Sequence, residues 1–263
     1  MSERWSVRAG RFGTMPETSE IRVEHDGPIT TITIDRDHKR NSLNAGVCSD
    51  IADAVDAAPG REECRVIVIR GEGRAFCAGA DLGGQHSDGN FHEQLARMLH
   101  SLQECPRIII ADVQGAAVGA GMQLSMAADL RVVGERGWFM IPPVKLGIAV
   151  DAWTIRRTRV LVGGARARTI LLAAEQVDQS EAKSCGLASY VGDSNVTREV
   201  AERIASFAPM SLEYHKMVLN DDETNLPPKP EQRELYERVW ASEDAAEAGR
   251  ARAEKRDPVF RGK

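Results

Sequence analysis

Two continuous apolar runs, each followed by a turn of small residues, constrain the fold of this chain most strongly. VIVIR (Val66–Arg70) leads into GEGRAFCAGADLGG, and RIIIADV (Arg107–Val113) leads into QGAAVGAG. Such runs are typical of strands buried on both faces. We therefore expect an α/β fold with a parallel sheet and right-handed crossovers. Ligands gather at the carboxyl ends of such strands, where helix N-termini present backbone N–H groups.

The remaining elements follow from residue spacing. Ile21–Val23 and Ile29–Ile34 are β-rich and flank HDGP, which predicts a hairpin. Leu130–Val133 predicts one more strand. Helical spacing predicts helices over Ala45–Ala58, Phe91–Cys105, Met122–Ala128, Asp151–Val162, Ala165–Leu172, Ser180–Cys185, Val196–Ala208, Ser211–Asn220 and, after a proline-rich break, the long charged segment Gln232–Arg256.

Composition restricts the class of protein. The chain has 263 residues, a net charge of −5 and 42% hydrophobic residues, which suits one large soluble domain. It has no basic run interleaved with aromatics, so we expect no nucleic-acid partner. Its apolar runs are too short for a membrane span, and the N-terminus lacks the apolar segment of a signal peptide. We expect a cytoplasmic protein with a flexible arm over residues 1–20.

Cysteines and histidines give no sign of a metal or redox site. The five cysteines are scattered and never form a CxxC pair, which fits reduced thiols. Cys77 lies in a small-residue turn, where a buried filler is a better interpretation than a nucleophile. His86, His92 and His100 do not repeat a metal-ligand spacing, so we expect no metal.

Four segments together carry a family resemblance. RAFCAGADL (Arg74–Leu82), QGAAVGAG with DLRVV (Gln114–Val133), the stretch Leu161–Val191 and the tail EKRDPVF (Glu254–Phe260) resemble the enoyl-CoA hydratase/isomerase (crotonase) family. The resemblance runs in one register from about Ile21 to the C-terminus, and the AGAD loop is its most specific part.

The resemblance implies a fold, an assembly and a ligand. It implies a spiral of ββα repeats as the core over residues 21–205, and a C-terminal helical region over residues 206–263 that forms a homotrimer or a dimer of trimers. It implies an acyl-CoA ligand from fatty acid metabolism, with coenzyme A as part of the thioester and no permanently bound cofactor.

The resemblance also implies an oxyanion hole made of backbone. In the family, two N–H groups bind the thioester oxygen as it gains negative charge, and they correspond here to Ala80 and Ala120. Donors fixed in the backbone need no reorganisation, and removing one typically costs about 10²–10³ in rate. Position 120 is usually glycine in the family, so the methyl group of Ala120 narrows the site.

Both catalytic glutamates of the family's hydratases are replaced. The first position, in GAGMQLSMAADL, holds Gln123, and the second, in IPPVKLG, holds Pro143. Neither side chain can accept a proton, and losing a positioned acid or base costs about 10²–10⁴ in rate. Ordinary hydration is therefore doubtful, as in the divergent mycobacterial paralogues that this chain resembles.

One carboxylate remains nearby, with two interpretations. Asp151 stands where isomerase-like members carry an aspartate that acts on the acyl chain. As an N-cap of the next helix it would contribute about 0.5–2 kcal/mol without any chemistry, and we favour the cap slightly. Trp153 replaces a glycine of the family pattern, and Met122 precedes Gln123. Both fit a reshaped acyl tunnel or plain core filling equally well.

The resemblance places the coenzyme A contacts on two loops and the C-terminus. Residues of the first loop correspond to the family segment that surrounds pantetheine and adenine: Ala78, Asp81, Leu82 and Gly83. Lys39 or Arg40 would meet the phosphates, and Phe260 and Lys263 match the C-terminal contribution.

Two functions are compatible with the sequence, beside a third possibility of a scaffold whose coenzyme A site is vestigial. The first is a protein that binds a fatty acyl- or enoyl-CoA without ordinary hydration. The second is an active hydratase/isomerase-type or thioester-processing enzyme that uses Asp151.

Overall fold

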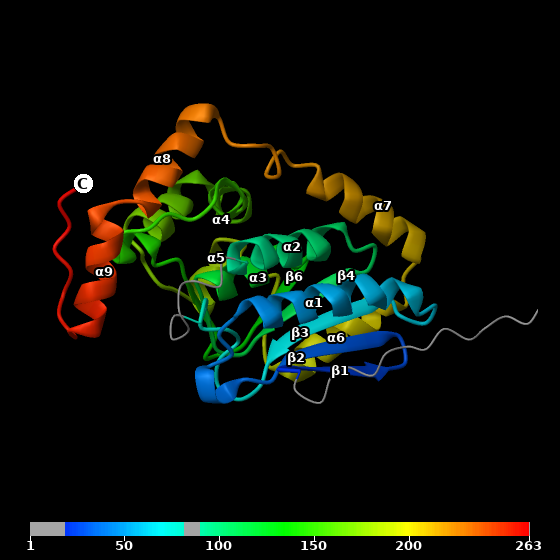
Figure 1. Cartoon of the computed structure of the whole chain (residues 1–263). Coiled ribbons are helices and arrows are strands. Elements are labelled where there is room, and N and C mark those ends of the chain that lie inside the picture. Colours follow the sequence, from blue (N-terminus) through cyan, green and yellow to red (C-terminus); the bar gives the residue numbers. More distant parts are fainter. Residues whose placement is uncertain (1–18, 82–89, 263) are drawn as a thin grey trace, which may run out of the picture.

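A six-stranded sheet forms the centre of the molecule (Figure 1). The computed structural model describes residues 19–81 and 90–262, so the predicted contacts Leu82, Gly83 and Lys263 and nearly all of the predicted arm lie outside the described residues. Strands β1 and β2 form the expected antiparallel hairpin, and every later pairing in this sheet is parallel. In spatial order the strands are β1 (Ile21–Asp26), β2 (Ile29–Ile34), β3 (Val66–Gly71), β4 (Ile108–Val113), β6 (Leu130–Val133) and β9 (Tyr190–Val191).

Helices cover both faces of this sheet. Helices α1 (Ala45–Ala57), α2 (Phe91–Glu104) and α3 (Ala120–Ala127) pack with the main core, which includes Ile67 and Ile69. Helix α6 (Ser194–Ala205) packs on the opposite face against Val66 and Val68. The alternate residues of β3 thus face two cores, which explains why its sequence is apolar without alternation.

A second, three-stranded sheet was not predicted from the sequence. It contains β5 (Ala116–Val118), β7 (Trp138–Met140) and β8 (Val177–Asp178), with β5 parallel to β7 and β7 antiparallel to β8. Strands of two or three residues are too short to show a period of two. This sheet holds the second small-residue turn in place, because Gly119 N–H donates to the Met140 carbonyl at 2.9 Å.

The chain after residue 151 is mainly helical, with α4 (Ala152–Leu172), α5 (Gln179–Ser184), α7 (Pro209–Asn220), α8 (Pro230–Trp240) and α9 (Glu243–Ala253) beside α6. Helix α4 is interrupted at Gly163, where φ is 75°. The single long helix expected over Gln232–Arg256 is wrong. It breaks at Ser242, whose hydroxyl caps α9 by accepting from Ala245 N–H at 3.1 Å.

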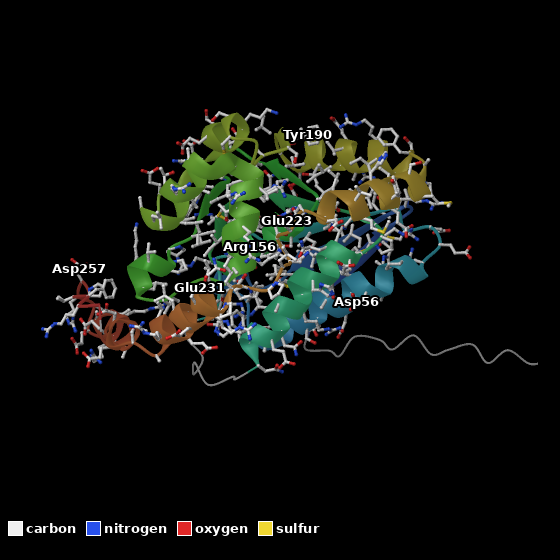
Figure 2. The ribbon with its side chains drawn as sticks, turned by 90° about the horizontal axis from the view of Figure 1, so that it is seen from above. Asp56, Arg156, Tyr190, Glu223, Glu231 and Asp257 are labelled. Carbon is white, nitrogen blue, oxygen red and sulfur yellow. The ribbon has the colours of Figure 1, made fainter. Side chains whose placement is uncertain are left out.

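Three short 3₁₀ helices complete the fold: η1 (Asp37–Lys39), η2 (Ala58–Gly60) and η3 (Pro143–Leu146). Figures 1 and 2 both place α8 and α9 at one end of the molecule, apart from α7. Helix α7 is bound to the core by Lys216, whose buried ammonium pairs with Asp129 at 2.9 Å. Within residues 19–81 and 90–262, no helix is long and apolar enough to cross a membrane.

Candidate functional site

The two small-residue turns lie side by side after β3 and β4. Cys77 N–H donates to the Ala116 carbonyl at 2.9 Å, and Val118 N–H donates to the Cys77 carbonyl at 3.0 Å. Gly121 is needed for this approach, because a Cβ there would lie 2.1 Å from the Cys77 carbonyl oxygen. The two turns, which are about 40 residues apart in the sequence, are therefore joined by backbone hydrogen bonds.

Ala80 turns its N–H toward the second turn. On one side of the first loop, Leu43 N–H donates to the Gly79 carbonyl at 2.8 Å and Asp81 N–H donates to the Leu43 carbonyl at 2.7 Å. Successive backbone groups of an extended chain alternate in direction, so the Ala80 N–H points to the opposite side, where Cys77 is paired with β5. No acceptor for it occurs in the part of the chain that the structure describes.

Ala120 contributes a second N–H from the start of α3. It is the first residue of that helix, where backbone donors have no partner within the helix. Gly119 before it has φ 54° and ψ −117°, a conformation that a residue with a Cβ rarely adopts. A Cβ at Gly79 would lie 3.7 Å from Ala120 N, so the loop that carries Ala80 adjoins this donor.

Gln123 and Asp151 meet although 28 residues separate them. Gln123 Nε2 donates to Asp151 Oδ2 at 3.0 Å and to Thr154 Oγ1 at 2.6 Å. The Thr154 hydroxyl donates in turn to Asp151 Oδ2 at 2.9 Å, and Thr154 N–H donates to Oδ1 at 2.9 Å. Asp151 therefore caps α4 through Oδ1, while its Oδ2 receives both side-chain donors.

Sequence reasoning missed Thr154, although a signal for it was present. An N-cap at Asp151 accepts from the backbone N–H three residues later, which places residue 154 beside the carboxylate whatever its side chain. The hydroxyl itself is completely buried, and the local pattern gives no hint that it bonds Gln123.

The other apolar candidates lie in or against the core. Met122 is completely buried within the main core, and Pro143 is buried as the first residue of η3. Trp153 is partly buried and packs against the main core, with its indole Nε1 enclosed and without a hydrogen-bond partner among the described residues.

The two candidate phosphate contacts, Lys39 and Arg40, differ in whether their charge is already paired within the protein. Lys39 pairs with Asp81 at 2.8 Å, and the same carboxylate binds the buried Arg36 at 3.1 Å. Arg40 is exposed, and no acceptor for its guanidinium occurs within residues 19–81 and 90–262. Its carbonyl accepts from Ala78 N–H at 3.0 Å, which fixes the start of the AGAD loop.

The C-terminal tail is bound to α9 rather than to the two turns. Phe260 is 40% exposed, and its neighbours Val259 and Arg261 donate their N–H groups to Glu247 and Asp244. The Arg256 guanidinium beside Glu247 lowers the pKa of that carboxyl to about 2.

Helix α8 adds an aromatic cluster that the sequence did not point to. Trp240 Nε1 donates to the Ala149 carbonyl at 3.1 Å, two residues before Asp151, and its ring meets His92 edge-on at 5.0 Å. Tyr236 lies 6.3 Å from the Trp240 ring. Burial raises the pKa of the Tyr236 phenol, and the nearby charge of Asp151 raises it further.

Several chemistries have no support from the described side chains. Burial raises the pKa of the Cys77 thiol to about 12, so it stays protonated at neutral pH, as expected for a filler. No group of three His, Cys, Asp or Glu side chains within residues 19–81 and 90–262 could hold a metal ion. Two surface cavities of about 300 and 410 Å³ lie elsewhere, the first beside Asp112 and the second between α2 and α7.

Comparison with known sequences gives a consistent result. The sequence model of the family described as "Enoyl-CoA hydratase/isomerase" matches residues 24–263. A probable enoyl-CoA hydratase, echA6, of Mycobacterium bovis is 38% identical over 92% of this chain and 99% of its own length. The 2,3-dehydroadipyl-CoA hydratase of Escherichia coli is 31% identical over 93% of this chain and 100% of its own length.

Solved structures share the fold. An enoyl-CoA hydratase from Mycobacterium avium subsp. paratuberculosis superposes with a TM-score of 0.82 at 27% identity, over 92% of this chain and 98% of its own. A methylmalonyl-CoA decarboxylase, at 23% identity, superposes with a TM-score of 0.85 over 93% and 99% of the two chains. These superpositions confirm the predicted fold with its helical C-terminal region.

Proposed function

The chain belongs to the enoyl-CoA hydratase/isomerase family, and from that premise we propose that it binds a fatty acyl- or enoyl-CoA thioester without ordinary hydration. The thioester oxygen accepts hydrogen bonds from the N–H groups of Ala80 and Ala120. One observation carries this proposal: two backbone N–H groups without acceptors among the described residues belong to adjoining loops.

The groups around this site support binding more than turnover. Hydration needs a base for the attacking water and an acid for the α-carbon. The first family position holds the amide of Gln123, whose two hydrogens are bound, and the second holds Pro143, which has no titratable group. The site thus keeps the means to hold a polarised carbonyl and lacks both glutamates.

Coenzyme A would extend from this site over the first loop. Arg40 is the better candidate for its phosphates, because Lys39 is already paired with Asp81. The free N-terminal end of α3 adds a favourable field for the developing negative charge on the thioester oxygen.

The test combines a binding and a turnover measurement. Isothermal titration with acyl-CoAs of several chain lengths should give a dissociation constant for at least one of them. Crotonyl-CoA incubated with the protein should keep its enoyl-thioester absorbance. Hydration at ordinary hydratase rates would contradict the proposal, and so would the absence of binding at every chain length.

Turnover that uses Asp151 is the second candidate function, and its position beside Gln123 favours it. It predicts conversion of some acyl-CoA that disappears in Asp151→Asn while ligand binding persists. Against it stand the three donors that already occupy the Asp151 carboxylate.

The oligomeric state is a prediction, and the exposed surface of α7 supports it. This helix exposes large apolar side chains to a degree unusual for a monomer: Met210, Tyr214, Met217, Val218 and Leu219. A homotrimer or a dimer of trimers would cover some of them. Light scattering on the purified protein gives the mass that tests it.

A further inference from the structure

The cavity of about 300 Å³ beside Asp112 lies at the carboxyl ends of β3 and β4, on the side of the main sheet that α6 covers. Figure 1 shows α6 on the side away from α1 and α2. Arg70 points to the α6 side, because Val66 and Val68 on the same strand pack there and side chains alternate along a strand. Asp112 is its register partner on β4 and bonds α6. Both residues line the cavity together with Arg136.

Two carboxylates line this cavity, and neutral donors already bond both of them. Asp112 accepts from one glutamine amide and two hydroxyls, each at 2.7 Å. Asp193 is the N-cap of α6 and accepts from the N–H groups of Asn195 and Val196 at 3.0 and 3.4 Å. Its second oxygen accepts from Asn195 Nδ2 at 3.1 Å. Both acids are therefore engaged in holding the start of α6 in place.

The two guanidiniums at the cavity are not engaged in this way. Arg70 is partly buried, and its guanidinium bonds no acceptor in the described part of the chain. Glu72, two residues further on, pairs with Arg22 instead at 2.9 Å. Arg136, in the turn between β6 and β7, is exposed and also has no acceptor among residues 19–81 and 90–262. The charged groups that remain available at the cavity are therefore both cations.

Two further polar groups near Arg70 lack partners. Ser194 is the first residue of α6 and lines the cavity, and the N–H at that position has no partner within the helix. Thr33 is the register partner of Arg70 on β2. It is 1% exposed, and its hydroxyl has no hydrogen-bond partner among the described residues. Leaving a buried hydroxyl unpaired costs stability, so tight packing alone does not explain the polar residues at this end of the sheet.

We propose that this cavity is a second binding site, which takes a phosphate group, free or as a monoester, between Arg70 and Arg136. A guanidinium donates two parallel hydrogen bonds to such a group, and its charge strengthens them. The Ser194 N–H and the field at the start of α6 favour the same negative charge. The proposal goes beyond the thioester site and does not depend on it, because α3 and its N–H donor pack with the core on the other side of the sheet.

The experiment is isothermal titration of the full-length protein with inorganic phosphate. Chloride keeps the ionic strength constant, so that general screening by salt does not contribute to the signal. We expect saturable binding of one phosphate per chain and no binding of acetate over the same range. A second titration uses glycerol phosphate, and the tighter ligand of the two shows whether the site prefers the free ion or a monoester.

Variants assign the binding to the two guanidiniums. Arg70→Met and Arg136→Met each remove charge-assisted hydrogen bonds, and each should lower phosphate affinity by about 10-fold or more. Arg65→Met is the matched control, because Arg65 is also partly buried and lies at the other end of β3. It should keep the wild-type phosphate affinity. All three variants should bind acyl-CoA as the wild-type protein does.

Each other outcome would overturn the inference. Absence of saturable binding of both phosphate and glycerol phosphate would do so, and so would an equal loss of affinity in Arg65→Met. Phosphate that acyl-CoA displaces, or that no longer binds to Arg40→Met, would belong to the coenzyme A contacts instead. Arg136 is exposed and makes no contact that the fold needs, so Arg136→Met keeps the test valid if Arg70→Met does not fold. None of these results bears on acyl-CoA binding, which the thioester titrations test separately.

Discussion

Two aspartates in this chain each bind a glutamine amide and a hydroxyl, on opposite sides of the main sheet. Asp112 accepts from Gln114 Nε2, Ser194 Oγ and Thr197 Oγ1, each at 2.7 Å. Asp151 accepts from Gln123 Nε2 and from the hydroxyl and N–H of Thr154. We call these the Asp112 cluster and the Asp151 cluster.

The clusters differ in what they leave unbonded. Gln114 also donates to the Gly192 carbonyl at 3.2 Å, and its Oε1 would lie 2.0 Å from a Cβ at Gly134, so this amide is packed against backbone. Gln123 Oε1 has no donor in the described part of the chain, and Gln123 belongs to α3, the helix that begins at Ala120. The same side-chain chemistry thus secures α6 to the sheet in one place and shapes a candidate binding site in the other.

The largest effect should come from Asp112→Ala. Asp112 is 3% exposed, and its loss removes three hydrogen bonds and leaves the hydroxyls of Ser194 and Thr197 without their acceptor. We expect the free energy of unfolding in urea to fall by about 3–5 kcal/mol. Acyl-CoA affinity of the folded protein should not change, and a selective loss of affinity would contradict the division between the clusters.

Gln123→Glu should give the second largest loss of stability, because it replaces a hydrogen bond to Asp151 by repulsion between two carboxylates. The new carboxylate would face Asp151, and two such groups cannot both ionise freely. One folded-state pKa rises above its unfolded value, so the native state binds the extra proton and stability falls as pH increases from about 4 to that raised pKa. We expect a loss of about 1–3 kcal/mol at pH 8 and a smaller one at pH 5.

The charge swap is the control for this prediction. Gln123→Glu combined with Asp151→Asn restores one carboxylate and one amide, and it should recover most of the stability at pH 8. Urea titrations of both variants at the two pH values test it. If the single variant is as stable as wild type at pH 8, the Gln123–Asp151 contact does not exist in solution.

The sequence predicts the two turns far better than it predicts either cluster. Val66–Ile69 and Ile108–Ala111 are apolar without alternation because both faces of those strands are buried. The family resemblance then assigns Ala80 and Ala120 to the turns that follow these strands. Strands β5, β7 and β8 are too short for a periodic signal, and the break at Ser242 lies within a uniform Ala-rich and charged segment.

The clusters depend on contacts that no local pattern encodes. Asp112 bonds residues 82 and 85 positions further along the chain, and Gln123 bonds residues 28 and 31 positions away. Local reasoning could assign Asp151 to an N-cap, which it is. Local reasoning could not show that the Gln123 amide lies opposite the Asp151 carboxylate.

A matched pair of threonine variants gives a smaller effect and a sharper comparison. Thr154→Val and Thr197→Val each remove one buried hydroxyl at nearly constant volume. Each should cost about 1–2 kcal/mol of unfolding free energy. Only Thr154→Val should also change acyl-CoA affinity, because it loosens Gln123. An equal change of acyl-CoA affinity in both variants would remove the distinction between the clusters.

The smallest effect should appear at Tyr236, which senses the charge of the Asp151 cluster. Burial and the Asp151 carboxylate both raise the pKa of this phenol. Asp151→Asn removes the negative charge that opposes ionisation, so the pKa should move down toward its ordinary value of about 10. Difference absorbance of the phenolate measures it, with Tyr236→Phe as the background, and Asp112→Asn should leave it unchanged. A Tyr236 titration that is the same in Asp151→Asn as in wild type would mean that α8 does not rest beside the Asp151 cluster in solution, and the aromatic cluster would then lie outside the candidate site.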